Sequence, residues 1–310
     1  MKKLIFCVLC MLGCMQMSFA QSVKFAILAD IHFDIMHDAK ERLQVFLDAA
    51  KKADVDFIID MGDFAHPKPA NQYAFDMWHS FPGETYNVIG NHDEDNGCTK
   101  EDYVKYAKMK APYYSFDKGD FHFIVLDPNT RYIDGKYVGY GAIIQKDQFE
   151  WLKNDLRSTD KRCVIFSHQS LEHFVTNRKE VRALLEAENE RAGFKKVVAA
   201  FSGHEHTNYE KVINGIVYIQ INSASNQWVG EDYKCERRFS KEINEAHPWL
   251  KCTVPYKDCL YAIVNINKKG LKLKGVESEF IAPTPEDLDM PTYWADCPLV
   301  PYIKDFKCKF

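Results

Sequence analysis

The sequence has few of the features that mark membrane proteins or nucleic-acid-binding proteins. Its one long apolar stretch runs from Leu4 to about Met15. This stretch is shorter than a typical transmembrane helix, so we expect no transmembrane segment. No cluster of lysine and arginine is interleaved with aromatic residues, and the formal net charge is only -4. This pattern argues against duplex nucleic acid as a partner and leaves small phosphorylated substrates open. The apolar and charged fractions, 46% and 27%, are typical of a globular protein with a sizeable core.

The N-terminus has the pattern of a signal peptide. Lys2 and Lys3 precede the apolar stretch, and Ser18-Phe19-Ala20 supplies the small residues that signal peptidase requires before its cleavage site. We therefore expect residues 1–20 to be removed and the protein to be exported to a periplasmic or extracellular location. The alternative is a lipid anchor on Cys14, because a Gly-Cys pair ends such signals, although the residues before this pair fit poorly.

The cysteines agree with an oxidising compartment. Seven remain after the predicted leader, and five of them lie in the last third of the chain: Cys235, Cys252, Cys259, Cys297 and Cys308. None of the seven belongs to a Cys-x-x-Cys pair, so we expect disulfides among these five rather than a zinc site, with the connectivity left open. Cys163 lies inside an apolar run and is predicted to be a buried free thiol.

Apolar runs of strand character alternate along the chain with segments of helical period. The first half predicts strand–helix units at residues 23–29 with 38–53, 57–59 with 70–79, and 87–89 with 101–109. The second half predicts a hairpin turn at 117–120, a helix at 145–156, strands at 164–166 and 197–201, a hairpin across Asn214-Gly215, and a strand pair around 268–270. We therefore predict an α/β fold in which two packed sheets, a β-sandwich, are flanked by helices over residues 21–276. Residues 277–310 are expected to form an irregular tail that packs on this domain.

Five polar clusters follow predicted strands, each at the point where the strand ends. They are Asp30-Ile31-His32, Gly62-Asp63, Gly90-Asn91-His92-Asp93, His168 and Gly203-His204-Glu205-His206. In open α/β sheets ligands bind outside the carboxyl ends of the strands, so loops far apart in sequence converge there. A single aspartate after a strand is often only a helix N-cap. The complete set, however, supplies the carboxylates, imidazoles and amide of a two-metal hydrolytic site.

This ordered set resembles the calcineurin-like metallophosphoesterase superfamily over residues 30 to 206. The resemblance implies a four-layer α/β/β/α fold and two divalent metal ions, which are Mn, Fe or Zn. One ion would be held by Asp30, His32, Asp63 and His206, and the other by Asp63, Asn91, His168 and His204, with Asp63 as the bridge. His92 would act as a general acid or stabilise the phosphate oxygens, and Asp93 would orient or charge it. The expected reaction is attack by a metal-bound hydroxide on phosphodiester or pyrophosphate bonds of small nucleotide-like or phospho-alcohol substrates.

One departure from the pattern concerns the residue three places after Asp63. Purple acid phosphatases place a metal-bound tyrosine there, whereas this chain has His66, so no tyrosinate–iron colour is expected. His66 either hydrogen-bonds near the site or caps the following helix. Segments 113–116, 123–127 and 148–152 look similar to those of manganese-dependent ADP-ribose/CDP-alcohol diphosphatases and cyclic-nucleotide phosphodiesterase-like proteins.

Two alternatives to this function remain. A phosphomonoesterase would use the same centre, and a catalytically silent scaffold would keep only the fold. Arg178 and Trp228 lie on loops on the metal side and would suit a phosphate and a planar ring respectively, but structural roles are commoner for such residues, so they stay outside the predicted site. No role is assigned to the remaining histidines His37, His79, His122, His173 and His247.

Overall fold

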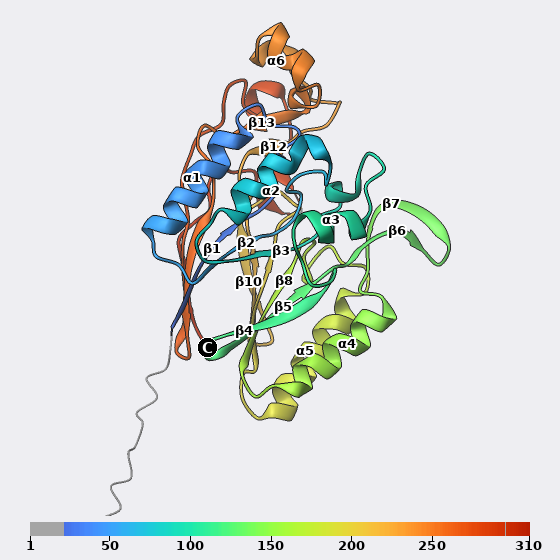
Figure 1. Cartoon of the computed structure of the whole chain (residues 1–310), viewed down its shortest axis with the longest axis vertical. Coiled ribbons are helices and arrows are strands. Elements are labelled where there is room, and N and C mark those ends of the chain that lie inside the picture. Colours follow the sequence, from blue (N-terminus) through green and yellow to red (C-terminus); the bar gives the residue numbers. More distant parts are fainter. Residues whose placement is uncertain (1–21, 295) are drawn as a thin grey trace, which may run out of the picture.

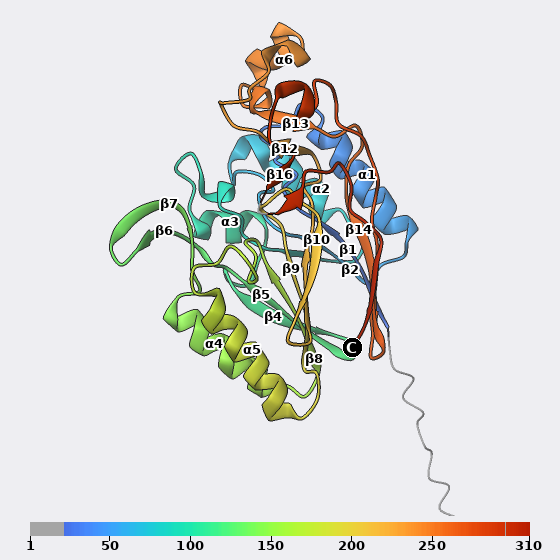
Figure 2. The same ribbon diagram turned by 180° about the vertical axis from the view of Figure 1, so that it is seen from behind.

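The computed structural model describes residues 22–294 and 296–310 of the chain (Figure 1). The predicted signal peptide and Cys14 lie outside the described residues. Two six-stranded sheets lie between groups of helices, so the predicted two-sheet α/β fold is confirmed (Figures 1 and 2). Within the described part of the chain, no helix is long and apolar enough to cross a membrane.

The first sheet is mixed and has the strand order β18-β15-β14-β1-β2-β3. Strands β1, β2 and β3 run parallel, whereas β14, β15 and β18 add antiparallel neighbours on the other side of β1. The strands span Val23–Leu28 (β1), Phe57–Asp60 (β2), Glu84–Asn87 (β3), Ala262–Asn267 (β14), Gly270–Lys274 (β15) and Phe306–Lys309 (β18).

The second sheet has the order β10-β11-β9-β8-β5-β4, with a parallel centre and an antiparallel strand at each edge. Asn214-Gly215 forms the β10–β11 turn and residues 119–120 form the β4–β5 turn, as the sequence predicted. The strands span Tyr114–Lys118 (β4), Phe121–Leu126 (β5), Arg162–Ser167 (β8), Val197–Ser202 (β9), Tyr209–Ile213 (β10) and Ile216–Gln220 (β11).

Helices cover the outer face of each sheet. The first sheet packs against α1 (Ala39–Lys52), α2 (Gln72–His79) and α3 (Lys100–Tyr106), and the second against α4 (Lys146–Ser158) and α5 (Arg178–Ala192). A segment before β14 carries α6 (Lys241–Ala246) and a small sheet of β12 (Asn226–Trp228) and β13 (Thr253–Pro255). The short 3-10 helices are Pro69–Asn71 (η1), His92–Glu94 (η2), Glu236–Arg238 (η3), Leu250–Cys252 (η4) and Glu286–Leu288 (η5).

The main core lies between the two sheets. Alternation along β1 places Phe25 and Ile27 in this core and turns Ala26 and Leu28 toward the helices. The Phe25 ring stacks on Phe57 at 4.9 Å. It also meets phenylalanines of the second sheet edge-on at 5.8 to 6.0 Å, so the aromatic contacts join the sheets from within.

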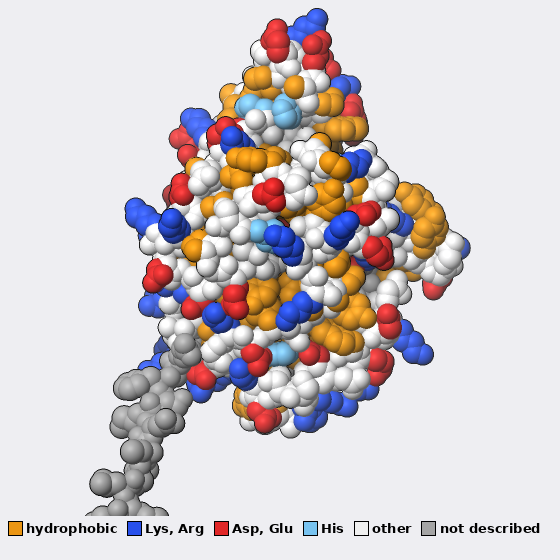
Figure 3. Space-filling view, viewed as in Figure 1, with side chains coloured by type: hydrophobic (Ala, Val, Ile, Leu, Met, Phe, Trp, Pro, Cys, Tyr) orange, Lys and Arg blue, Asp and Glu red, His pale blue; other side chains and the backbone are white. Residues whose placement is uncertain are grey.

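The structure differs from the sequence-based expectation in three places. Strands β6 (Asn129–Ile133) and β7 (Lys136–Ala142) form an unpredicted hairpin, which projects from the body with exposed apolar side chains (Figures 1 and 3). The tail is not wholly irregular, because β18 completes the first sheet and β16 (Tyr293–Trp294) pairs with β17 (Cys297–Pro298). All seven described cysteines are free, so the expected disulfides are absent among these residues. Cys163 is buried, as predicted.

Candidate metal centre

The five predicted clusters lie on loops that leave the carboxyl ends of β1, β2, β3, β8 and β9. The structure brings six of their side chains together in two sets, and the ligand atoms in each set lie within 4.8 Å of one another. The first set is Asp30, His32 and His206, and the second is Asp63, His168 and His204. Each set combines residues from both sheets, so the centre lies where the two sheets meet.

The two sets adjoin one another at the carboxylate of Asp63. Its Oδ2 lies 3.3 Å from His168 Nε2 and 3.9 Å from His32 Nε2, so this one oxygen reaches both sets. Asp30 Oδ1 lies 3.6 Å from His206 Nε2. Asn91, the one amide in the predicted ligand set, places its Oδ1 3.1 Å from His168 Nε2. Ligand atoms of all seven predicted residues therefore lie close together, six in the two sets and Asn91 beside His168.

The backbone of the ligand loops is unusual. Five of the grouped residues have a positive φ: 52° at Asp30, 49° at His32, 54° at Asp63, 74° at His204 and 48° at His206. Residues other than glycine rarely adopt this left-handed backbone conformation, which costs about 1–3 kcal/mol per residue and is concentrated at functional sites. The loops therefore hold the ligands in place at a cost to the stability of the fold.

Glycine is required between the loops because they approach so closely. A Cβ on Gly90 would lie 2.2 Å from Asp63 Oδ1, and a Cβ on Gly203 would lie 2.6 Å from Asp30 Oδ2. Both contacts are far shorter than the van der Waals distance. The glycines of the Gly-Asn-His-Asp and Gly-His-Glu-His clusters therefore make room for the carboxylates.

Hydrogen bonds to the backbone orient two of the imidazoles. His168 Nδ1 donates to the Met61 carbonyl and His206 Nδ1 donates to the Asn226 carbonyl, both at 2.7 Å. Each bond places the proton on Nδ1 and leaves the Nε2 lone pair directed into the centre. His206 Nε2 then faces His32 Nε2 at only 3.2 Å. Two ring nitrogens brought this close within a buried pocket are well suited to a shared cation, so the residues fit a metal site.

The charges of the centre point to the same conclusion. Burial would raise the pKa of Asp63, but the neighbouring imidazoles, His168 first, hold it well below its usual value. Burial lowers the pKa of His32 and of His204 to about 3, so both rings are neutral. Burial would also lower the pKa of His168, but Asp63 outweighs burial and raises it to about 10. Positive charge is therefore strongly favoured beside Asp63.

His92 stands at the edge of the centre rather than within either set. Its backbone N–H donates to Asp63 Oδ1 at 2.7 Å, and its ring Nδ1 bonds Asp95 Oδ2 at 2.7 Å. The side chain is 34% exposed, whereas those of Asp30, Asp63 and His168 are buried. Asp95 also accepts hydrogen bonds from Arg131 and from the Tyr140 hydroxyl, both at 2.8 Å. The β6–β7 hairpin is thereby tied to the carboxylate that orients His92.

The expected role of Asp93 requires correction. Its carboxylate does not bond the His92 ring but accepts backbone N–H groups of Asp63, Phe64 and Gly90, at 2.7 to 3.1 Å. The first 3-10 turn after Asn91 directs Asp93 inward to these amides, whereas Asp95, three residues after His92, reaches the ring. Asp93 therefore fixes the two loops to each other, and Asp95 orients the histidine. The spacing His92-x-x-Asp95 was the signal in the sequence for this pair.

The other residues that the sequence singled out lie around the centre without entering it. His66 Nδ1 pairs with Asp34 at 3.1 Å and its Nε2 lies near Asn96, so it bonds beside the site and does not cap η1. Arg178 donates to the Val175 carbonyl at the start of α5, which is a structural role. Trp228 lies at the rim, with its ring centre 6.5 Å from that of His92.

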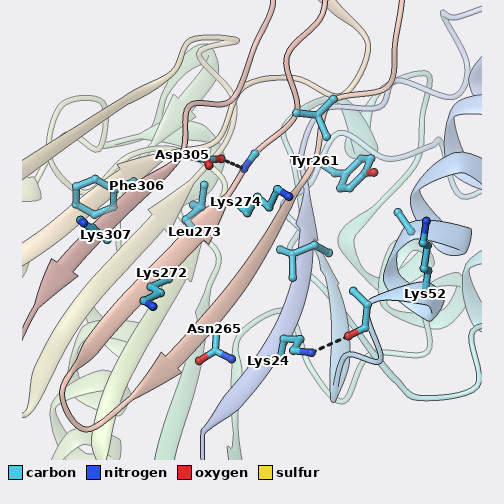
Figure 4. A pocket seen from close by; sticks show the side chains of 15 residues that line it. Lys24, Lys52, Tyr261, Asn265, Lys272, Leu273, Lys274, Asp305, Phe306 and Lys307 are labelled. Atoms are coloured by element: carbon cyan, nitrogen blue, oxygen red, sulfur yellow. Dashed lines mark hydrogen bonds between the residues drawn. The ribbon is translucent and has the colours of Figure 1, made fainter.

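A large groove lies elsewhere on the described residues. It has a volume of about 940 Å³ and runs between α1 and the outer face of β14 and β15, where Lys24, Lys52, Lys272 and Lys274 line an apolar floor (Figure 4). None of its lining residues belongs to the metal centre. The chemistry indicated by the sequence therefore lies at the buried ligand clusters rather than in this groove.

Comparison with known proteins agrees with the fold and the ligand pattern. The family model described as calcineurin-like phosphoesterase matches residues 23–208. Purple acid phosphatase 15 of Arabidopsis thaliana is 29% identical over 164 residues, which cover 45% of this chain and 29% of the plant protein. The match thus spans under a third of that relative's length. A dimetal phosphatase from Danio rerio superposes with a TM-score of 0.58 at 14% identity, covering 84% of this chain and 99% of that structure.

A second solved structure, GAP50 of Plasmodium, described as the anchor in the inner membrane complex, superposes with a TM-score of 0.54 at 16% identity. It covers 82% of this chain and 84% of its own. These likenesses at low identity show the fold. The fold and the order of the polar clusters therefore define the class of protein, which is that of the metallophosphoesterases. The family match covers more than half of the chain, and the protein belongs to the calcineurin-like phosphoesterases.

Proposed function

We propose that this protein is an exported, metal-dependent phosphoesterase that cleaves phosphodiester or pyrophosphate bonds of small nucleotide-like or phospho-alcohol substrates. The observation that carries the proposal is the convergence of six carboxylate and imidazole ligands, in two adjoining sets, beside a partly exposed histidine. Family membership supports the same class of reaction. Export is supported by the N-terminal pattern of residues 1–20 and would be tested by sequencing the mature N-terminus, which should begin at Gln21.

The ligand assignment follows the two sets. Asp30, His32 and His206 would hold one cation and His168 and His204 the other, with Asp63 shared and Asn91 added to the second. When bound, two divalent cations supply Lewis acidity toward phosphate oxygens and lower the pKa of coordinated water toward neutrality. The mixed oxygen and nitrogen donors suit Mn, Fe and Zn alike.

His92 is the residue best placed to move a proton. His92 Nδ1 donates a hydrogen bond to Asp95, which fixes a proton on Nδ1 and leaves Nε2 available for proton transfer. Burial would lower the pKa of His92, but the charges of Asp63 and Asp95 outweigh it and raise the pKa, which favours the protonated ring. In that form Nε2–H would donate a proton to the departing alkoxide, a contribution of roughly 10² to 10⁴ in rate.

The charge of the centre favours a substrate with a single negative charge at the reacting phosphorus. The strongest charged neighbours of Asp30 and Asp63 are histidines and carboxylates of the centre itself rather than lysines or arginines. Arg131, which lies nearby, is already bonded to Asp95 and to the Asn91 carbonyl at 3.1 Å. A dianionic monoester carries one more negative charge than a diester and would need more cationic side chains than these neighbours supply.

Phosphomonoesterase activity is the second candidate, because both the plant relative and the zebrafish structure carry the word phosphatase in their names. A panel of bis-nitrophenyl phosphate, nitrophenyl phosphate, cyclic nucleotides and nucleotide diphosphate esters, tested with each metal, separates the two. Higher kcat/KM on the diesters supports the first proposal, and higher kcat/KM on nitrophenyl phosphate supports the second. Protein that retains no metal after growth in Mn or Zn would refute both and favour a silent scaffold.

A further inference from the structure

A group of exposed aromatic rings lies near His92. The ring centre of Tyr140 is 4.7 Å from that of His92, and the ring centre of Trp228 is 6.5 Å from it. The ring centre of Trp249 is 6.5 Å from that of Trp228. The exposed fractions are 43% for Tyr140, 37% for Trp228 and 54% for Trp249. Large rings gathered on the surface next to a reactive group indicate a ligand contact, whereas scattered single rings need no explanation.

We refer to Trp228 and Trp249 together as the indole platform. Their backbones are joined: Trp228 pairs with Thr253 across β12 and β13, and the Cys252 N–H donates to the Trp249 carbonyl at 2.9 Å. Val229 also donates to the Cys252 carbonyl at 2.9 Å. The two indoles are therefore presented by one hydrogen-bonded unit, so little ordering is needed when a ligand binds.

Two kinds of ligand bind to exposed indole rings: planar heteroaromatic bases, by stacking, and quaternary ammonium groups, by cation–π attraction. The arrangement of the rings distinguishes them. Trp228 and Trp249 have ring centres 6.5 Å apart and planes tilted by 41°. Two neighbouring rings at this angle do not enclose one point as the aromatic cage for a quaternary ammonium does, whereas a planar base needs only one exposed ring face.

We propose that the indole platform stacks the base of a nucleoside phosphate ester and holds this nucleoside as the leaving group beside His92. This inference rests on the proposed phosphoesterase function and narrows its substrate class. His92 would protonate the departing ester oxygen, so the group next to its ring is the one that leaves. With the base stacked on Trp228, the ribose would lie between the indole platform and His92, so its ester oxygen could reach the His92 ring.

The platform also predicts tolerance toward the identity of the base. Stacking uses the face of the ring, which every base has, whereas discrimination between bases requires hydrogen bonds to their edges. Both purine and pyrimidine nucleosides should therefore be accepted, with purines favoured because their rings are larger.

A binding experiment tests the platform without any catalysis. Metal-free protein labelled with ¹⁵N-tryptophan should give one indole signal for each of its five tryptophans. Trp228→Phe and Trp249→Phe assign two of them by loss of the signal. Adenosine should shift these two in a saturable manner and leave Trp294, which is 56% exposed in β16, unchanged. Shifts caused by choline instead of adenosine, or shifts at Trp294 equal to those of the platform, would overturn the proposal, as would the absence of shifts.

A kinetic experiment tests the platform in the metal-loaded enzyme. The substrates are the nucleoside and glycerol members of the ester class that the wild type turns over, such as AMP against glycerol 3-phosphate for monoesters and their methyl esters for diesters. Loss of base stacking, worth roughly 1–3 kcal/mol, should lower the nucleoside-over-glycerol ratio of kcat/KM about five- to 150-fold in Trp228→Ala and Trp249→Ala, mainly through KM. Trp294→Ala is the matched control and should keep the wild-type ratio.

An unchanged ratio in both platform variants would overturn the proposal. If the wild type turns over no substrate at all, the proposed function fails, but the metal-free binding experiment still decides whether the indoles bind a base. The two inferences can therefore fail separately.

Discussion

The carboxylate of Asp95 gives the sharpest test of how the site works. It accepts a hydrogen bond of 2.7 Å from His92, and the Asp95→Asn variant keeps the shape while removing the charge. A hydrogen bond to a charged partner contributes about 1.5–3 kcal/mol, which corresponds to roughly a tenfold to 150-fold effect. The two side chains are 23% and 34% exposed, so screening by water places the expected loss of kcat in the lower part of that range, about tenfold to 30-fold.

The assay compares leaving groups. Alkoxides need a proton as they depart, whereas nitrophenolate does not, so Asp95→Asn should lower kcat on alkyl esters and have little effect on nitrophenyl esters. His92→Ala should show the same selectivity with a larger loss, of roughly 10² to 10⁴. The control is Asp134→Asn, which alters an exposed carboxylate in the turn of the β6–β7 hairpin.

The dependence on pH gives a second readout. Asp95 contributes to the raised pKa of His92, so its removal lowers that pKa. Activity that requires protonated His92 is present below this pKa and lost above it, and the alkaline limb of the pH–rate profile should therefore move to lower pH in Asp95→Asn. Equal losses on alkyl and nitrophenyl substrates, with an unmoved alkaline limb, would refute the idea that Asp95 acts through His92.

Three further predictions follow from the centre and from the second sheet. Asp63→Ala should lose both metals and all activity; metal analysis that finds one ion still tightly bound would show that Asp63 does not bridge. Gly90→Ala should weaken metal binding at least tenfold and lower the melting temperature, because its Cβ would lie 2.2 Å from Asp63 Oδ1, and normal metal content would contradict this packing argument. The ring of His122 lies 2.7 Å from Asp117 and 2.8 Å from Asp155; burial would lower its pKa, but these carboxylates outweigh burial and raise the pKa. The two ion pairs of His122 therefore stabilise the fold below the unfolded pKa of about 6.5, and this stability is lost as pH rises through the higher folded pKa. His122→Gln should accordingly reduce the free energy of unfolding more at pH 5.5 than at pH 9 in denaturant titrations.

Strand and helix patterns were readable from the sequence because each is governed by local periodicity. The five polar clusters could be placed at strand ends for the same reason, and the order of strands then brings those ends together. Strand β18 could not be foreseen, since its four residues gain their conformation by pairing with β15 at a sheet edge. The strand conformation of β18 is therefore determined by tertiary contacts and not by local sequence preference.

The pair of Asp95 with His92 was missed for a different reason. Asp93 stands next to His92 in the chain, but a 3-10 turn sends adjacent side chains in different directions, and only residues three apart share a side. The β6–β7 hairpin, which supplies Arg131 and Tyr140, did carry a local signal, because Asp134-Gly135 is a common hairpin turn. The contact of that hairpin with Asp95 depends on packing over more than 30 residues of chain, as in the 36-residue separation of Arg131 and Asp95.

The division of the ligands between the two sheets has a consequence for biosynthesis. Each cation set draws on residues from both sheets, and both sets include a residue from the segment 204–206. A growing chain therefore cannot complete either cation site until the second sheet has been made and docked on the first. Metal capture would therefore follow the docking of the two sheets, and a bound cation would hold together the strand ends that carry its ligands.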